Sequence, residues 1–241
     1  MPAQNTRVTC IAFFPLLLLA AASAHAFSLA PMSVSLDPNG KGATRSFTID
    51  NNSGEKLAIQ VSMAAREVNA AGVEKNPDAD DDFVVYPSQI VLGGNEKRTV
   101  RVTWAGNAKP DKELAFRIIA EQLPVDTHKP DKKDQAVIRM LLRYMGAVYI
   151  TPRGSSPRIE VIRLEHVKNK LAVTVGNLGT AHQIINSARI RIGSVELKDE
   201  DTKALSGLNL LAGGERRFEI AWPAQLTAEN LKSKAELEIK K

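Results

Sequence analysis

The chain has 241 residues, with 32 basic and 27 acidic side chains and a single cysteine. Its mild positive charge is dispersed and contains no Lys/Arg block with interleaved aromatic residues, which argues against nucleic-acid binding. After the first residues no apolar run reaches the length of a membrane span, so we expect no membrane insertion.

Residues 1–26 have the pattern of a secretory signal peptide. Arg7 supplies a positive charge, an apolar segment too short to span a bilayer follows, and Ala24-His25-Ala26 forms a cleavage signal. We expect export and cleavage after Ala26. Because Cys10 lies in this leader, the cleaved chain would contain no disulfide and would depend on its hydrophobic core.

Short segments in which apolar and polar residues alternate begin soon after the leader. Gly, Pro, Asn and Asp separate them, as in an antiparallel sandwich of immunoglobulin type. The expected strands are MSVSL (32–36), RSFTID (45–50), LAIQVSM (57–63), FVVYPSQIVL (83–92), RTVRVTW (98–104) and LAFRIIAEQL (114–123).

A boundary follows residue 151, because Pro152, Gly154 and Pro157 interrupt any strand ladder. The alternating pattern then restarts, and only TAENLKS (227–233) favours a helical turn. We therefore predict an all-β protein of two tandem immunoglobulin-like β-sandwich domains, residues 27–151 and 152–241. The second set of expected strands is 158–167, 170–177, 183–193, 194–199, 216–222 and 234–240.

The two predicted domains carry a faint internal repeat. FTIDNNSGEKLAIQV is echoed by LAVTVGNLGTAHQII, in which a strand again ends in Asn and a Gly follows before the next strand. IVLGGNEKRTVRVTW is echoed by NLLAGGERRFEIAW, with a Gly-Gly turn and a strand that ends in Trp104 or Trp222. We expect both tryptophans to be core residues and the Gly-Gly pairs to be turns.

No catalytic motif is present. His128, His166 and His182 are too scattered for a metal-binding motif, and no nucleophile elbow, phosphate-binding loop or zinc-protease signature occurs. The acidic run at 78–82 lacks the Gly and the closing Glu of an EF-hand, which favours a solvated loop over a calcium site. We expect no enzyme activity, no metal and no cofactor.

Residues 134–154 form a long segment that is apolar in both alternating rows. The even row contains Ile138, Met140, Leu142 and Tyr144, while the odd row is interrupted by arginines at positions 139 and 143. A buried central strand would expose neither row, but fifteen residues span about 50 Å, which is long for a sandwich strand. The alternative is an edge strand whose odd row faces the core and whose even row awaits a partner strand by β-addition.

The segments around Phe116-Arg117-Ile118 and Pro124, with the long strand that ends in Thr151-Pro152, resemble the periplasmic pilus-assembly chaperones (PapD-like). The resemblance implies two domains set at an angle, and a long strand that donates side chains to a pilin-like subunit lacking one strand. It also implies delivery of that subunit to an outer-membrane usher. The implied donor residues are Ile138, Met140, Leu142 and Tyr144.

The resemblance breaks down at the carboxylate anchor. Better-known members hold the subunit's terminal carboxylate with an arginine in the first strand and a lysine on the long strand. This chain has no basic residue between Phe27 and Gly40 and has Ala147 at the lysine position, which places it nearer a divergent, non-classical branch. Arg117 and Arg143 are the replacement candidates, with Arg139 third.

Other interpretations stay open at this point. Arg117 is equally explained by pairing within its own sheet, and Arg143 by an ordinary surface charge. Self-association of the free protein is a further possibility. The alternative function is a secreted two-domain adhesin or ligand-binding module, which would bury the row at Ile138, Met140 and Leu142.

Overall fold

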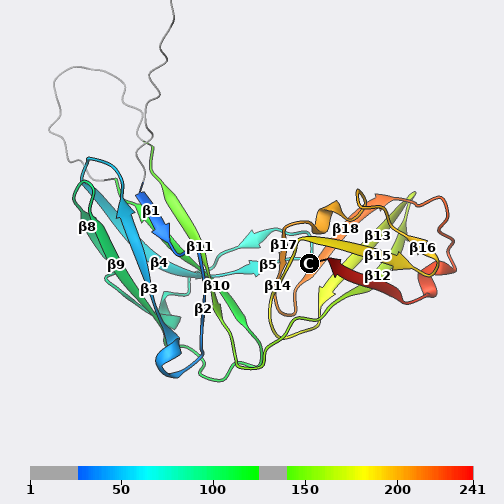
Figure 1. Cartoon of the computed structure of the whole chain (residues 1–241), viewed down its shortest axis with the longest axis horizontal. Helices are drawn as coiled ribbons and strands as arrows, with labels where there is room; N and C mark the ends of the chain where they lie inside the picture. Colours follow the sequence, from blue (N-terminus) through cyan, green and yellow to red (C-terminus); the bar gives the residue numbers. More distant parts are fainter. Residues whose placement is uncertain (1–26, 125–139, 241) are drawn as a thin grey trace, which may run out of the picture.

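The computed structural model describes residues 27–124 and 140–240, which fold into two β-sandwich domains that meet at an angle (Figure 1). One hydrophobic core is built by residues 27–150 and a second, separate core by residues 159–239. Residues 151–158 connect them without a strand. The predicted fold class of two tandem immunoglobulin-like sandwiches is confirmed, while the domain bounds stay predictions.

Two sheets form the first sandwich, and their inward rows supply its core. The first sheet has the order β1 (Phe27–Ala30), β3 (Thr44–Asn51), β9 (Lys97–Trp104) and β7 (Phe83–Tyr86). The second sheet has the order β2 (Ser33–Leu36), β11 (Arg143–Ile150), β10 (Leu114–Gln122), β4 (Leu57–Ala65) and β8 (Gln89–Leu92). Two 3-10 turns, η1 (Gly40–Ala43) and η2 (Asp80–Asp82), lie between strands.

The second domain is built from shorter sheets around its own core. Their orders are β12 (Ile159–Val167), β13 (Lys170–Asn177) and β18 (Glu215–Ala221); β14 (Gln183–Ile185) and β17 (Leu208–Leu210); and β16 (Val195–Glu196), β15 (Ser187–Ile192) and β19 (Ala235–Lys240). The remaining 3-10 turns are η3 (Lys203–Leu205) and η4 (Asn230–Lys232). The helical turn expected within 227–233 corresponds to η4.

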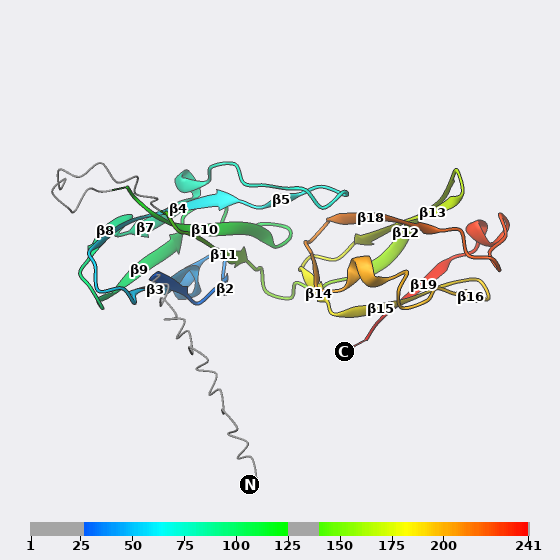
Figure 2. The ribbon, with the colours of Figure 1, turned by 90° about the horizontal axis from the view of Figure 1, so that it is seen from above.

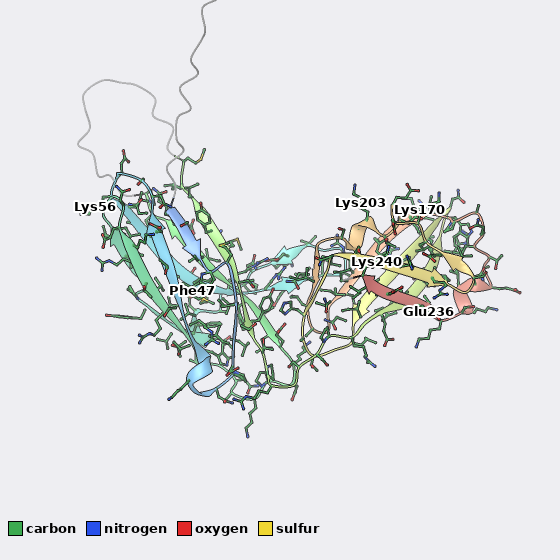
Figure 3. The ribbon with its side chains drawn as sticks, viewed as in Figure 1. Phe47, Lys56, Lys170, Lys203, Glu236 and Lys240 are labelled. Atoms are coloured by element: carbon green, nitrogen blue, oxygen red, sulfur yellow. The ribbon has the colours of Figure 1, made fainter. Side chains whose placement is uncertain are left out.

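Polar and apolar residues separate between surface and core as the alternating patterns predict. Figure 3 shows Phe47 inside the first sandwich, where it is fully buried, while Lys56 and Lys170 lie at the surface of the two domains. Trp104 belongs to the first core, and Trp222 packs, partly buried, against the second.

The structure departs from the expected strands in several places. β1 and β17 were not expected, and the expected strand 183–193 is divided between β14 and β15, which lie in different sheets. The segment 83–92 is divided between β7 in one sheet and β8 in the other, because Pro87 has no N–H and interrupts the ladder. A small hairpin, β5 (Glu67–Val68) and β6 (Glu74–Lys75), was not expected. This β5–β6 hairpin projects from the first domain and reaches the second, where Arg217 N donates to Ala70 O at 2.8 Å (Figure 2).

The faint sequence repeat corresponds to one hydrogen-bonding arrangement that occurs in both domains. Asn51 and Asn177 are fully buried at the ends of β3 and β13. Each amide oxygen accepts from the backbone N–H two residues later, and each amide nitrogen donates to the carbonyl four residues later. Each amide nitrogen also donates to a carbonyl in or just before the Gly-Gly turn, that of Gly93 or Leu210.

A buried carboxylate joins the two domains at their connection. Glu113 accepts hydrogen bonds from Thr151 Oγ1 at 2.8 Å and from His182 N at 2.9 Å, and its Oε1 lies 2.6 Å from His182 Nδ1. The His182 ring stacks on Tyr149 with centroids 3.9 Å apart. Burial raises the pKa of Glu113, but the hydrogen bonds from His182 and Thr151 outweigh it and leave the pKa lowered.

We predict that Asn51→Ala and Asn177→Ala each lower the free energy of unfolding by about 2–4 kcal/mol, because each removes a buried amide that donates to two turn carbonyls. Urea denaturation followed by tryptophan fluorescence measures the change. Asn52→Ala, at the exposed neighbouring position, is the matched control. A loss below about 0.5 kcal/mol in both variants would show that these amides do not hold the turns.

Candidate functional site

The even row of β11 faces the core of the first domain. Val148 and Ile150 are fully buried, and Leu142 and Tyr144 pack against the same core. The Tyr144 ring meets Phe27 edge-on with centroids 4.8 Å apart. The expectation that the odd row faces inward is therefore wrong. The reason is that a guanidinium stays hydrated on the outer face, whereas on the inner face Arg143 would be buried in the sandwich.

The even row continues past the end of the sandwich. Met140 is 79% exposed, and Leu142, two residues on, is already half-buried. The donor row thus extends the core of the first domain rather than forming a separate face. Ile138 and Arg139 lie outside the described residues.

One edge of β11 is only partly covered. β10 pairs with β11 from Arg143 to Ile150, but on the opposite edge β2 pairs only with Ala147–Ile150. Within residues 27–124 and 140–240 no strand pairs with Arg143–Gly146 on that side. We call this segment the open edge. In Figure 1, β11 runs from the far tip of the first domain towards the connection between the domains.

Backbone hydrogen bonds show which peptide groups point out of the open edge. Leu142 O accepts from Gln122 N beside β10, whereas Ala147 N and Thr151 N donate to Met32 O and Leu36 O on the β2 side. Because successive residues of a strand direct their N–H and C=O groups to opposite edges, those of Arg143 and Met145 point away from β10. The open edge can therefore accept a further strand.

On the outer face of the same sheet, Arg66, Glu74 and Arg117 form an ion-pair group that we call the arginine cluster. Arg117 binds Glu74 with two parallel hydrogen bonds, Nε to Oε1 and Nη2 to Oε2, each 2.7 Å long. Arg66 Nε donates to Glu74 Oε2 at 3.0 Å. Hydrogen bonding by Arg117 lowers the pKa of Glu74 to about 2, so the carboxylate is ionised at neutral pH.

The register places Arg117 directly opposite Ala147 on β11 and Ala64 on β4. Ala147, which stands where the resemblance leads us to expect a lysine, therefore has a guanidinium as its cross-strand neighbour. Next to it, Arg66 Nη1 donates to Tyr149 Oη at 3.2 Å, and Asn209 of the second domain donates to the same oxygen at 2.7 Å. The arginine cluster is thus attached to both domains.

Arg143 lies apart from the arginine cluster. It is four residues along β11 from Ala147, a separation of about 13 Å. Its Nε is 3.9 Å from Glu121 Oε2, and both side chains are more than half exposed. Such a surface pair contributes about 0–1 kcal/mol. The structure therefore does not bring the two anchor candidates together.

Sequence reasoning did not identify Glu74, Arg66 or Tyr149. Glu74 reaches Arg117 because the β5–β6 hairpin folds beside the end of β4, where Asn76 Nδ2 donates to Ala65 O. Arg66 lies at that end of β4 and binds the same carboxylate. The hairpin sequence has no motif that indicates this contact. Tyr149 was recognised only as part of an apolar row.

Two further features lie away from the open edge. Asp80, in the acidic run, accepts a hydrogen bond from Met63 N.

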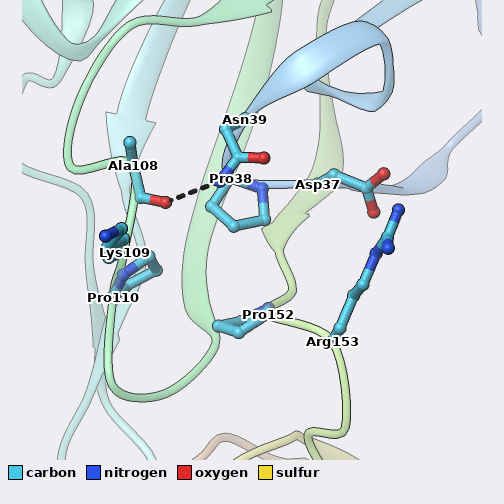
Figure 4. A pocket seen from close by; sticks show the side chains of 8 residues that line it. All are labelled: Asp37, Pro38, Asn39, Ala108, Lys109, Pro110, Pro152 and Arg153. Atoms are coloured by element: carbon cyan, nitrogen blue, oxygen red, sulfur yellow. Dashed lines mark hydrogen bonds between the residues drawn. The ribbon is translucent and has the colours of Figure 1, made fainter.

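A shallow pocket of about 420 Å³ lies at the base of the first domain, lined by Asp37, Pro38, Asn39, Ala108, Lys109, Pro110, Pro152 and Arg153 (Figure 4). It contains none of the predicted site residues.

Within the part of the chain that the structure describes, no group of three or more His, Cys, Asp or Glu side chains is arranged to hold a metal ion. The same residues contain no helix of the length and apolarity needed to cross a membrane.

The fold is similar to those of solved fimbrial chaperones. A chaperone–tip adhesin complex of CFA/I fimbriae biogenesis has 16% identity and a TM-score of 0.59, over 89% of this chain and 98% of that chain. The CsuC–CsuE chaperone–tip adhesion subunit complex of Acinetobacter baumannii has 13% identity and a TM-score of 0.55, over 81% and 90%. The SafB chaperone with SafA pilin of Salmonella enterica has 16% identity and a TM-score of 0.53, over 85% and 87%.

Comparison with curated protein sequences found no match. A family model described as the pili and flagellar-assembly chaperone, PapD N-terminal domain, matches residues 28–156, more than half of the chain and all but the first residue of the first sandwich. These residues include the arginine cluster and the open edge. The chain belongs to the PapD-like family of pilus-assembly chaperones.

Proposed function

We propose that this chaperone binds pilin-like subunits by β-addition at the open edge of β11 and delivers them to an outer-membrane usher. The observation that carries the proposal is the unpaired outer edge of Arg143–Gly146 beside the exposed side chain of Met140. A subunit strand there would complete the hydrogen bonds that β2 leaves unmade. The side chains of Ile138, Met140, Leu142 and Tyr144 are the proposed donors.

An open edge beside an exposed apolar side chain is an aggregation hazard in a free protein. Proteins usually block such edges with charges, proline or a covering loop. Here Arg143 is the one charged side chain on the open edge itself, and it lies beside Glu121 of β10. Binding a partner strand removes the hazard for both chains, which is the physical basis of a chaperone that needs no nucleotide.

Packing supplies the affinity in this proposal. Each large apolar donor side chain buried in a subunit contributes about 1.5–3 kcal/mol. Since Leu142 and Tyr144 are already half-buried in the first domain, the gain from Met140 is the largest among the described donors. Release then requires exchange for a strand that fits better, without an external energy source.

The described geometry favours Arg117 over Arg143 as the carboxylate anchor. A strand paired along the open edge must stop near Ala147, where β2 begins. Arg117 is the cross-strand neighbour of Ala147, so the end of that strand lies in the same row as Arg117. A terminal carboxylate at this point is the natural partner of a guanidinium.

The similar solved structures include chaperones in complex with a pilin and with tip adhesins. We infer a partner of the same type for this chain, a secreted subunit with an incomplete β-sandwich. Export through the leader with cleavage after Ala26, a periplasmic location and a non-enzymatic role belong to the same proposal. The adhesin alternative predicts a buried donor row, and the exposure of Met140 argues against it.

We predict that Met140→Asp weakens subunit binding by about 10- to 100-fold, because a carboxylate would be buried where a thioether packs. Co-purification with pilin-like subunits from the same source, followed by titration, measures the loss. Tyr86→Asp is the matched control, since Tyr86 is an equally exposed apolar residue on the distant edge strand β7. Equal binding by wild type and the Met140 variant would contradict the donor assignment.

A second prediction tests the backbone. Arg143→Pro removes an N–H that points out of the open edge, so the fold persists while subunit binding drops by about tenfold or more. Arg143→Ala keeps the N–H and changes binding little. Melting temperatures confirm that both variants are folded. If the alanine variant loses as much affinity as the proline variant, the side chain and not the backbone edge is what the subunit contacts.

A further inference from the structure

We infer that Glu74 is an internal ligand that holds Arg117 away from the open edge, and that the terminal carboxylate of a bound subunit takes Arg117 from it. This inference rests on the proposed function and adds a competition step to it. The free chaperone would then contain its own substitute for the group that it recognises.

The first argument is the direction in which Arg117 reaches. Residues 76–79 lie beside β4 on the side away from β10, since Ala65 N donates to Pro77 O and Ala79 N donates to Met63 O. The order across the sheet is therefore β11, β10, β4 and then the strand end that follows Glu74. The register that pairs Ala64 with Asp78 and Val68 with Glu74 places Glu74 past the end of β4. To bind Glu74, Arg117 therefore extends along the sheet towards the second domain, away from Arg143–Gly146.

The second argument is the small size of the side chains that flank Arg117. Ala147 has only a methyl group between Arg117 and the edge of β11. Small side chains flank Arg117 on both sides, so its guanidinium can lie across either neighbour. A rotation about its side-chain bonds would turn it from Glu74 towards Ala147, beside the end of a partner strand.

The third argument is charge. Two guanidinium groups share one carboxylate in the arginine cluster, and Arg66 keeps contact with Glu74 through its own hydrogen bond. Release of Arg117 therefore does not leave Glu74 without a cation. A second carboxylate brings the group to two cations and two anions, which lowers the cost of the exchange.

The exchange of carboxylates at Arg117 would also affect the contact between the β5–β6 hairpin and the second domain. Glu74 lies on the β5–β6 hairpin, whose tip accepts a hydrogen bond from Arg217 through Ala70 O. The guanidinium of Arg216 lies directly against Gly72, where a Cβ would stand 1.2 Å from its Nη1. Loss of the Arg117 contact removes two of the hydrogen bonds that tie this hairpin to the first domain.

The test uses two synthetic ten-residue peptides of alternating valine and serine, one with a free C-terminal carboxylate and one amidated. Affinities for wild type, Glu74→Gln and Arg117→Gln are measured by titration. We expect Glu74→Gln to bind the acid peptide about five- to tenfold more tightly than wild type does, with the amide unchanged. Arg117→Gln should bind both peptides equally.

Two more variants make the result interpretable. Glu67→Gln, an exposed glutamate on the same hairpin, should behave as wild type. Glu74→Asp retains the charge but is one methylene shorter, so it should also raise the affinity for the acid peptide relative to the amide peptide. This variant provides the test if Glu74→Gln folds poorly. Amide exchange of residues 67–75 in wild type should accelerate when the acid peptide binds and not when the amide binds.

The outcomes separate this inference from the proposal beneath it. If both peptides bind and the acid-to-amide ratio is the same in wild type, Glu74→Gln and Glu74→Asp, the competition is wrong and the open-edge proposal stands. If neither peptide binds any variant and pilin-like subunits do not bind either, both are wrong. If Glu74→Gln weakens binding of the acid peptide, Glu74 assists the anchor and the inference is overturned.

Discussion

The structure depends on the limited length over which β2 pairs with β11. β2 ends the sheet only along Ala147–Ile150, and the rest of β11 keeps one edge of its backbone unpaired. Because the even row of β11 belongs to the first core, the same strand is anchored at one end and open at the other. Extending β2 by four residues would cover the edge and convert the first domain into an ordinary closed sandwich.

This arrangement places recognition and support on opposite faces of one sheet. The inner face carries the row that leads from the core to Met140, while the outer face carries the arginine cluster that faces the second domain. The two meet at Ala147, where β2 begins and Arg117 lies alongside. The chaperone would thus recognise a partner strand on the open edge in two ways. Donor side chains pack along the length of the strand, and Arg117 binds the carboxylate at its end.

Much of the fold followed from sequence patterns, because the sandwich strands alternate with one polar row and turn residues separate them. The orientation of β11 did not, because both of its rows are apolar and the period of two cannot decide between them. The sequence showed Asn51 and Asn177 only as matching positions in a faint repeat and did not predict that both side chains are buried. The role of Glu74 was not predicted, because its contact with Arg117 joins residues 43 positions apart. The contact also depends on the β5–β6 hairpin, which the alternation of apolar and polar residues did not indicate.

The most direct test of the account is residue-resolved hydrogen exchange of β11 in the free chaperone and in its complex with a subunit. Pairing at the open edge predicts fast exchange of the Arg143 and Met145 amides in the free protein and strong protection in the complex. The Tyr144 amide, which points towards β10, should be protected in both. Unchanged exchange at Arg143 and Met145 on binding would contradict strand addition at this edge.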